Sequence, residues 1–165
     1  MKKRFLALLA VLLMLPCAIA ETDAPEDLYA IIEMTAVKAE LDERYDCIET
    51  EDGYFLYEGE VLCAFYESGR LQAKTRVFEN VGDIAPVADL PIEKLSSYKQ
   101  GMTLAEVTGA FGEEGLEIMK TNLADEENSG VRLVLVWKTE NGDVVQALFE
   151  LDDNEWVLFA IAEVK

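Results

Sequence analysis

The chain has 165 residues, of which 33 are acidic, 14 are basic and none is histidine, and its net charge is −19. So acidic a protein is repelled by nucleic acid and by anionic lipid, which argues against either as a partner. Without histidine there is no imidazole base, no histidine-assisted nucleophile and no ordinary zinc or iron centre, so most enzyme classes are improbable. We therefore expect a non-enzymatic protein with no catalytic residues, no metal and no cofactor.

The N-terminus has the pattern of a secretory signal peptide. Basic residues at positions 2–4 precede an apolar run over 5–15 and a small-residue site that ends at Ala20. The apolar run is shorter than the about 20 residues that a spanning helix needs, so residues 1–20 are predicted to be cleaved off. Lipidation at Cys17 is the alternative. Cleavage removes three basic and no acidic residues and lowers the net charge from −19 to −22. The product is expected to be secreted or held at the cell surface, with no remaining membrane span.

The first half of the remaining chain predicts a helix followed by four strands. Apolar residues recur at three- and four-residue steps over about 26–43, which is typical of an amphipathic helix. Apolar and aromatic runs follow, separated by Asp-Gly, Glu-Gly and Ser-Gly pairs that suit tight hairpins. The predicted strands cover 45–49, 54–57, 60–67 and 71–78.

The second half repeats this order after a stretch without sustained periodicity at 79–90, which is predicted to be a linker. A short helix is expected over 91–98. Thr103 and Glu106 have the spacing of a capping box at the start of the next helix. Four further strands are then predicted at 116–121, 131–138, 143–151 and 156–164, with Asn141-Gly142 as a hairpin turn.

A short motif supports the idea of duplication. Met34-Thr35 and Met102-Thr103 each stand at the beginning of a helical pattern. The chain is therefore predicted to be an α+β protein of two tandem repeats, residues 21–78 and 91–165. Each repeat would be a helical segment packed on a four-stranded antiparallel β-sheet.

Two cysteines, Cys47 and Cys63, remain after the predicted cleavage. In an oxidising compartment an even pair so close in sequence suggests one disulfide, and two buried thiols are the alternative.

The second half also carries a family resemblance. Gly101-Met102-Thr103, the following Val107 and the succession of two helices and four strands resemble the repeat of the β-lactamase-inhibitor protein family and its wider relatives among small bacterial envelope proteins. The resemblance implies a protein-binding module whose tandem sheets present a concave face. Its sharpest form is an inhibitor of a β-lactamase or a penicillin-binding enzyme, and the wider relatives imply a scaffold in envelope assembly. In that family a disulfide follows the second helix of each repeat, which Cys47 and Cys63 would match.

The most useful indication of a binding face comes from aromatic residues, which are enriched at the centres of protein interfaces. Strand alternation makes four of them candidates for an open, partner-binding face, with core or edge packing as the alternative: Tyr57, Tyr66, Trp137 and Trp156. Gln72, Lys74 and Arg76 alternate with apolar residues and predict a basic outward face on their strand. A small-molecule-binding envelope protein, with an apolar pocket between sheet and helices, is the alternative function.

Overall fold

The protein is described by a computed structural model that covers residues 27–89, 92–123 and 130–164. The predicted signal peptide at 1–20, with Cys17, lies outside these residues. In the part of the chain that is described, no helix is long and apolar enough to cross a membrane.

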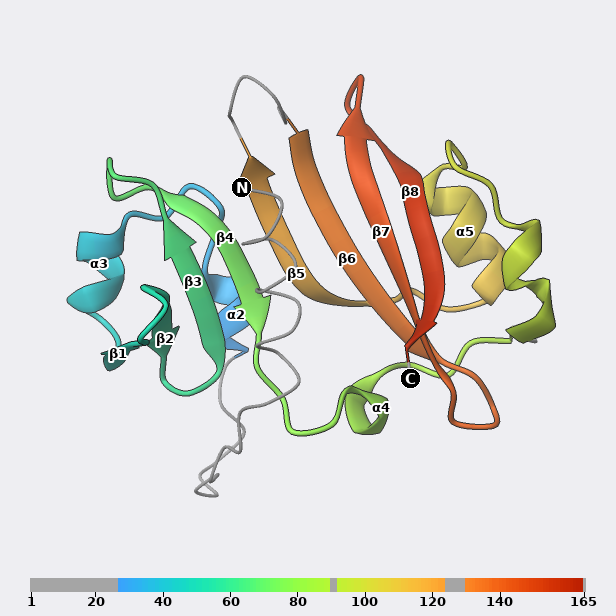
Figure 1. Ribbon diagram of the computed structural model, residues 1–165, viewed down its shortest axis with the longest axis horizontal. Coiled ribbons are helices and arrows are strands. Elements are labelled where there is room, and N and C mark those ends of the chain that lie inside the picture. The colour runs from blue at the N-terminus through green and yellow to red at the C-terminus, as the bar shows by residue number, and fades with distance from the viewer. Residues whose placement is uncertain (1–26, 90–91, 124–129, 165) are drawn as a thin grey trace.

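Within the described residues the strands form one continuous antiparallel sheet of eight, and each lies beside its neighbours in the sequence, as Figure 1 shows. In the first half they are β1 (Cys47–Glu49), β2 (Phe55–Tyr57), β3 (Val61–Phe65) and β4 (Leu71–Arg76). In the second half they are β5 (Leu116–Leu123), β6 (Gly130–Lys138), β7 (Val144–Asp152) and β8 (Glu155–Val164). All eight predicted strands are thus present, with bounds that differ by a few residues.

The predicted architecture of two repeats, each with its own four-stranded sheet, was nevertheless wrong. Strand β4 pairs with β5 through Ala73↔Thr121, Lys74↔Lys120 and Thr75↔Met119, and this pairing, which we call the seam, merges the halves. Two separate sheets would have left β4 and β5 as edges with unpaired N–H and C=O groups, and pairing removes both edges. The helices among the described residues are also few and short.

The single helix predicted over 26–43 was also wrong. Two short helices replace it, α2 (Leu28–Ile31) and α3 (Lys38–Asp42). The first ends because Ile32 has an extended backbone with φ −71° and ψ 103°. The side chain of Asp27 begins α2 by accepting a hydrogen bond from the backbone N–H of Ala30, as expected of an aspartate at an N-cap.

The two Met-Thr motifs do not occupy corresponding positions. Thr103 immediately precedes its helix and forms a backbone bridge with Val157 at the start of β8. In the first half the residue that precedes α3 and bridges to Arg70, beside β4, is Val37 and not Thr35. The backbone bridge that Thr103 makes in the second half is therefore made in the first half two residues after Thr35, the threonine of the Met-Thr motif.

Helix α5 (Leu104–Phe111) confirms the predicted capping box. The hydroxyl of Thr103 accepts a hydrogen bond from the backbone N–H of Glu106, and the Glu106 carboxylate accepts one from the backbone N–H of Thr103. Gly112 ends the helix in the left-handed region at φ 75°, where glycine has no steric penalty. The helix buries Val107 and Phe111 against the sheet.

The segment predicted as a linker is packed on the sheet. It contains α4 (Val81–Ile84), and the 3₁₀ helix η1 (Ile92–Ser97) follows it. The backbone of Pro86 and Ala88 hydrogen-bonds to Lys138 of β6, and Ala85 and Ala88 are buried.

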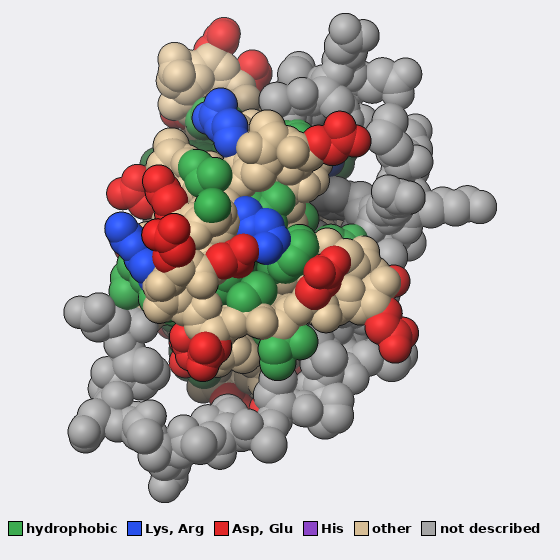
Figure 2. Space-filling model, turned by 90° about the vertical axis from the view of Figure 1, so that its left-hand side faces the viewer, with side chains coloured by type: hydrophobic (Ala, Val, Ile, Leu, Met, Phe, Trp, Pro, Cys, Tyr) green, Lys and Arg blue, Asp and Glu red, His purple; other side chains and the backbone are tan. Residues whose placement is uncertain are grey.

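Both faces of the sheet carry a core. On one face, a cluster around Tyr57 lies under α2 and α3, and a larger cluster around Trp137 and Phe111 lies under α5. Alternate residues of β6, Val134 and Val136, face the other way and pack beneath the α4 segment. Figure 2 views the end of the molecule formed by the first half, where acidic side chains are spread widely between hydrophobic and basic ones.

Candidate binding site at the seam

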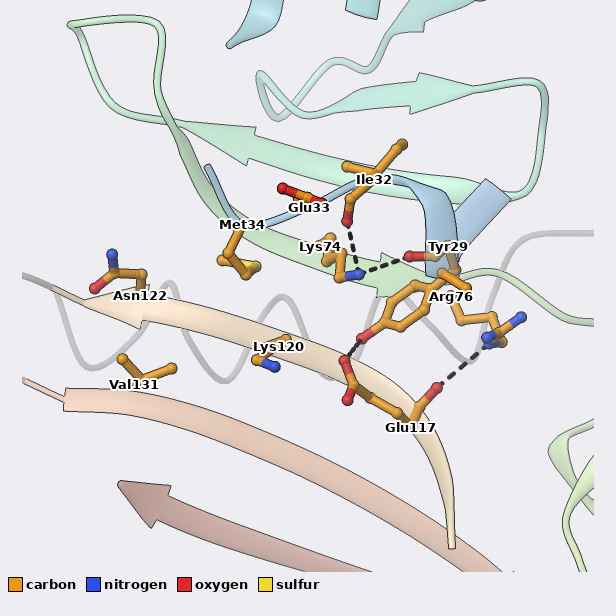
Figure 3. Close-up of a pocket in the computed structure, with 11 residues that line it drawn as sticks. Tyr29, Ile32, Glu33, Met34, Lys74, Arg76, Glu117, Lys120, Asn122 and Val131 are labelled. Atoms are coloured by element: carbon orange, nitrogen blue, oxygen red, sulfur yellow. Dashed lines mark hydrogen bonds between the residues drawn. The ribbon is translucent and has the colours of Figure 1, made fainter. Parts of the chain in front are cut away.

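A cavity of about 480 Å³ lies where the two halves meet, between α2 and strands β4, β5 and β6 (Figure 3). We call it the seam cavity. Residues of the first half that line it include Tyr29, Ile32, Glu33, Met34, Lys74 and Arg76. The second half contributes Glu117, Lys120, Asn122 and Val131. Figure 3 shows Tyr29, Arg76 and Glu117 at one end, Met34, Asn122 and Val131 at the other, and the two lysines between them.

Lys74 is the most deeply buried charged residue of this site, with 6% of its surface exposed. Its ammonium group donates hydrogen bonds to the carbonyls of Tyr29 at 2.6 Å and Ile32 at 2.8 Å. These carbonyls lie at the C-terminal end of α2, where a cation is favourable. The same ammonium group lies 4.1 Å from the centre of the Tyr29 ring. Lys74 therefore anchors α2 to β4.

The position of Lys74 shows that the prediction of a basic outward face on β4 was wrong. Lys74 lies opposite Cys63 in the β3–β4 register, and Cys63 belongs to the core beneath α2. Directly opposed residues share a face, so Lys74 and its alternate Arg76 point under the helix rather than out into solvent.

Lys120 is half-buried and lies directly opposite Lys74 across the seam. Its ammonium group lies 5.6 Å from the centre of the Trp156 ring. Within the described residues, neither lysine has a carboxylate within ion-pair distance. Like charges directly opposed on a sheet are destabilising, so two unpaired lysines at this register position require an explanation in a protein with 33 acidic residues.

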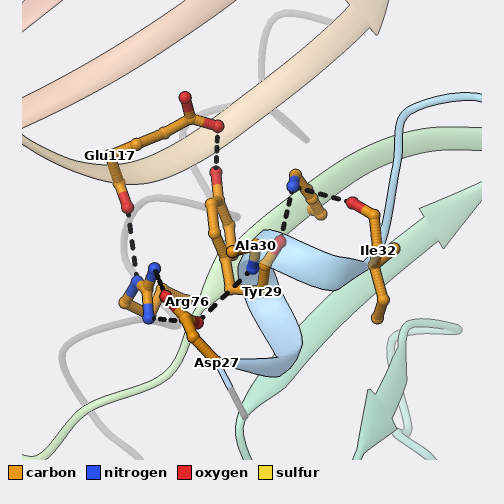
Figure 4. Close-up of polar contacts among 7 residues, drawn as sticks. Asp27, Tyr29, Ala30, Ile32, Arg76 and Glu117 are labelled. Carbon is orange, nitrogen blue, oxygen red and sulfur yellow. Dashed lines mark hydrogen bonds and ion pairs between the residues drawn. The ribbon is translucent and has the colours of Figure 1, made fainter.

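A second group of contacts closes one end of the cavity and ties the halves together (Figure 4). The Tyr29 hydroxyl donates a hydrogen bond to the Glu117 carboxylate at 3.0 Å. Arg76 donates through Nε to the Glu117 carbonyl at 3.3 Å. Its two terminal nitrogens donate to the Asp27 carboxylate at 2.7 and 2.8 Å, a bidentate geometry that fixes the guanidinium. Arg76 is therefore neutralised locally, unlike the two lysines.

Burial and neighbouring charges shift the pKa values of this site. Burial lowers the pKa of Lys74, and the nearby Lys120 lowers it too, while Glu117 opposes both. Burial and the adjacent Glu117 raise the pKa of Tyr29, so its hydroxyl remains a donor across the ordinary pH range. The hydrogen bond from Arg76 lowers the pKa of the Asp27 carboxyl.

The groups that line the cavity are suited to binding a ligand. They include the ammonium groups of Lys74 and Lys120, the Glu117 and Glu33 carboxylates, and the apolar surface of Met34. Glu33 is exposed and accepts a hydrogen bond from the Thr35 hydroxyl at 3.2 Å. Among the described residues, no group of three or more histidine, cysteine, aspartate or glutamate side chains could hold a metal ion.

Two of the four aromatic residues predicted on a partner-binding face are core residues. Tyr57 and Trp137 each have 0% of their surface exposed. Tyr57 donates a hydrogen bond to Asp42 of α3 at 2.7 Å, and the Trp137 indole donates to the Glu113 carbonyl at 3.0 Å. Each ring thus packs under a helical segment with its polar atom satisfied, and neither can enter a partner.

The other two aromatic residues lie next to lining residues of the seam cavity. Tyr66 is half-buried and its hydroxyl donates a hydrogen bond to the carbonyl of Asn122. Trp156 is half-buried, packs beside the larger core cluster and contacts Lys120. Both therefore remain candidates for partner binding, now in relation to a defined cavity.

The predicted disulfide is absent, and Cys47 and Cys63 are free thiols. They lie on β1 and β3, which pair with opposite edges of β2. Alternate strands of a sheet are about 10 Å apart, well beyond the about 4.4–6.8 Å between Cα atoms that a disulfide allows.

Sequence reasoning missed most of the cavity. Tyr29, Glu117 and Lys120 carried no motif, because the seam that brings them together joins segments far apart in the chain. The one available signal was the alternation of Lys74 and Arg76 with apolar residues, which was interpreted as an exposed strand face. Comparison with protein-family models and with curated proteins found no match to this chain.

Proposed function

We propose that this protein is a non-enzymatic recognition module that acts outside the cytoplasm and holds a projecting group of a partner protein in the seam cavity. The supporting observation is that Lys74 and Lys120, opposed across the seam, have no carboxylate within ion-pair distance among the described residues, in a protein of net charge −19. Two ammonium groups in a cavity of an otherwise acidic protein attract an acidic projection, while the acidic surface elsewhere repels it, which favours one docking orientation. The extracytoplasmic location depends on the signal peptide predicted at 1–20.

Two half-buried aromatic residues support the choice of a protein partner. Trp156 contacts Lys120, and Tyr66 contacts Asn122, so each half of the protein places an aromatic ring next to a residue that lines the cavity. Tyrosine and tryptophan next to a desolvated pocket are the residues that most often dominate the free energy of protein association.

The sharpest form of this proposal is inhibition of a β-lactamase or a penicillin-binding enzyme, which the family resemblance over about residues 91–165 suggests. A scaffold role in envelope assembly is the other form. A stoichiometric amount of the protein should inhibit hydrolysis of a β-lactam in the first case and leave it unchanged in the second.

A small-molecule-binding function is the second candidate. The cavity volume of about 480 Å³ falls within the range of about 300–1,000 Å³ that is usual for ligand sites. A rise in melting temperature with a small ligand, without any protein partner, would favour this alternative.

The deciding experiment measures saturable binding to the secreted and surface proteins of the source cell. Trp156→Ala and Lys120→Glu alter the site, and Phe159→Ala is the control because Phe159 is 44% exposed and does not line the cavity. We expect both site variants to lose a partner that the control retains. Binding that all three variants retain, or the absence of any partner, would contradict the proposal.

A further inference from the structure

The unusual feature of the seam cavity is that, among the described residues, no carboxylate is bonded to either of its two ammonium groups. Lys74 and Lys120 are opposed in the β4–β5 register, on the face that carries α2. Lys74 donates hydrogen bonds to the backbone carbonyls of Tyr29 and Ile32, which carry no net charge. The Lys120 ammonium group has no ion pair among the described residues and lies 5.6 Å from the centre of the Trp156 ring. Two positive charges therefore share one cavity, and no counter-charge from the described part of the chain is bonded directly to either.

The other charged groups that face the cavity are already engaged. Asp27 holds Arg76 through two hydrogen bonds. The Glu117 carboxylate accepts from the Tyr29 hydroxyl, and that of Glu33 accepts from Thr35 at the exposed rim. These contacts hold both carboxylates away from ion-pair distance of either lysine, and so the space between the lysines is the most favourable place for an added anion.

We propose that the seam cavity is a carboxylate-binding site, in which an acidic group lies between the ammonium groups of Lys74 and Lys120 and its carbon chain lies against Met34 and Val131. This inference rests on the proposed function when the carboxylate belongs to a partner protein. The Glu33 and Glu117 carboxylates also line the cavity and would repel a highly charged polyanion, so the site favours one carboxylate at the lysines, such as that of an aspartate or glutamate side chain.

The test uses the purified protein with glutarate and, as a matched neutral probe, glutaramide. Binding is followed by the indole N–H signal of Trp156 in NMR spectra, since this ring contacts Lys120. We expect glutarate to shift that signal saturably and glutaramide to leave it unchanged. Lys120→Met should weaken glutarate binding by about tenfold to a hundredfold, as expected when one charge-assisted hydrogen bond is lost.

The matched control is Lys94→Met, which removes one positive charge from the exposed surface of η1. Lys120 is preferred to Lys74 for the test because loss of Lys74 would also release α2. Equal weakening in both variants, or no shift with glutarate, would overturn the carboxylate site.

The two proposals fail in distinguishable ways. A captured partner that Lys120→Met binds as tightly as the unaltered protein does would overturn the carboxylate site and leave the recognition function standing. Glutarate binding without any protein partner would support the site, identify a free small acid as its ligand and overturn the recognition function.

Discussion

The close approach of Gly115 to Trp137 gives the most direct test of the core packing. A Cβ atom added at Gly115 would lie 2.4 Å from Cζ2 and 2.6 Å from Cε2 of the indole. The ring has no room to retreat, because Trp137 is fully buried and its ring centre lies 4.6 Å from that of Phe111 in an edge-on arrangement. Its Nε1 is also held by the Glu113 carbonyl at 3.0 Å. Gly115→Ala must therefore displace a ring that is fixed on several sides.

The expected cost follows from these contacts. Overpacking a filled core typically costs about 1–3 kcal/mol, and the contact at Gly115 belongs at the upper end because it is with a rigid aromatic ring. A displaced indole would also weaken the hydrogen bond to Glu113, which adds about 1 kcal/mol. We expect Gly115→Ala to lower the free energy of unfolding by about 3–4 kcal/mol.

Urea denaturation of the purified protein measures this cost, and Gly109→Ala is its matched control. Gly109 lies on the exposed side of α5, and nothing lies within 4 Å of an added Cβ. Alanine in a helix interior is favoured over glycine, so the control should gain about 0.5–1 kcal/mol.

A double-mutant cycle separates the clash from other effects of the added methyl group. In a Trp137→Leu background the indole is gone, and Gly115→Ala should then cost less than about 1 kcal/mol, a coupling of about 2 kcal/mol or more. An equal cost in both backgrounds, or a cost below about 0.5 kcal/mol in the unaltered protein, would refute the packing argument.

Three further predictions concern single contacts. Thr103→Ala removes the capping box of α5 and should lower the free energy of unfolding by about 1 kcal/mol; no change in the urea midpoint would contradict this. The pKa of Asp27 is lowered below 3.8 by Arg76, so its contribution to stability is present above about pH 4 and lost as the pH falls through the lowered value. Asp27→Asn should therefore be less stable at pH 7 and lose less of its melting temperature on acidification, whereas parallel curves would count against the ion pair. Burial raises the pKa of Cys63 to about 12, and iodoacetamide at pH 8 should modify it only after denaturation, as mass spectrometry can show. Rapid modification of the native protein, or a mass that indicates a disulfide with Cys47, would disprove the free, buried thiol.

The order and approximate bounds of the strands could be predicted because each depends on local pattern. Alternating apolar residues, and glycines such as Gly53 and Gly142 with positive φ in the turns, report on a few neighbouring positions at a time. The start of α5 was equally readable, since Thr103 and Glu106 satisfy each other within one helical turn.

The joining of the halves could not be predicted in the same way. Which strand pairs with β4 depends on where the chain returns after α4, η1 and α5, and no local pattern encodes that path. The apolar spacing over 26–43 was real, but it was divided between two short helices because Val37 pairs with Arg70 beside β4. The Trp137 and Tyr57 side chains were placed on the wrong face because strand parity was counted across turns of unknown geometry.

The opposed lysines at the seam allow stability and binding to be separated. If the seam served stability alone, a glutamate at position 120 would suit it better, since it would lie opposite Lys74. Replacing a like-charged cross-strand pair by an oppositely charged pair stabilises a sheet by about 0.2–1 kcal/mol. Lys120→Glu should therefore raise the free energy of unfolding in urea by that amount while abolishing glutarate binding, a trade-off typical of binding sites. Lys120→Gln is the control, because it removes the repulsion without adding an attraction and should lie between the two. If Lys120→Glu instead destabilises the protein, Lys120 stabilises the fold through its contact with Trp156. The opposed lysines would then no longer indicate a ligand.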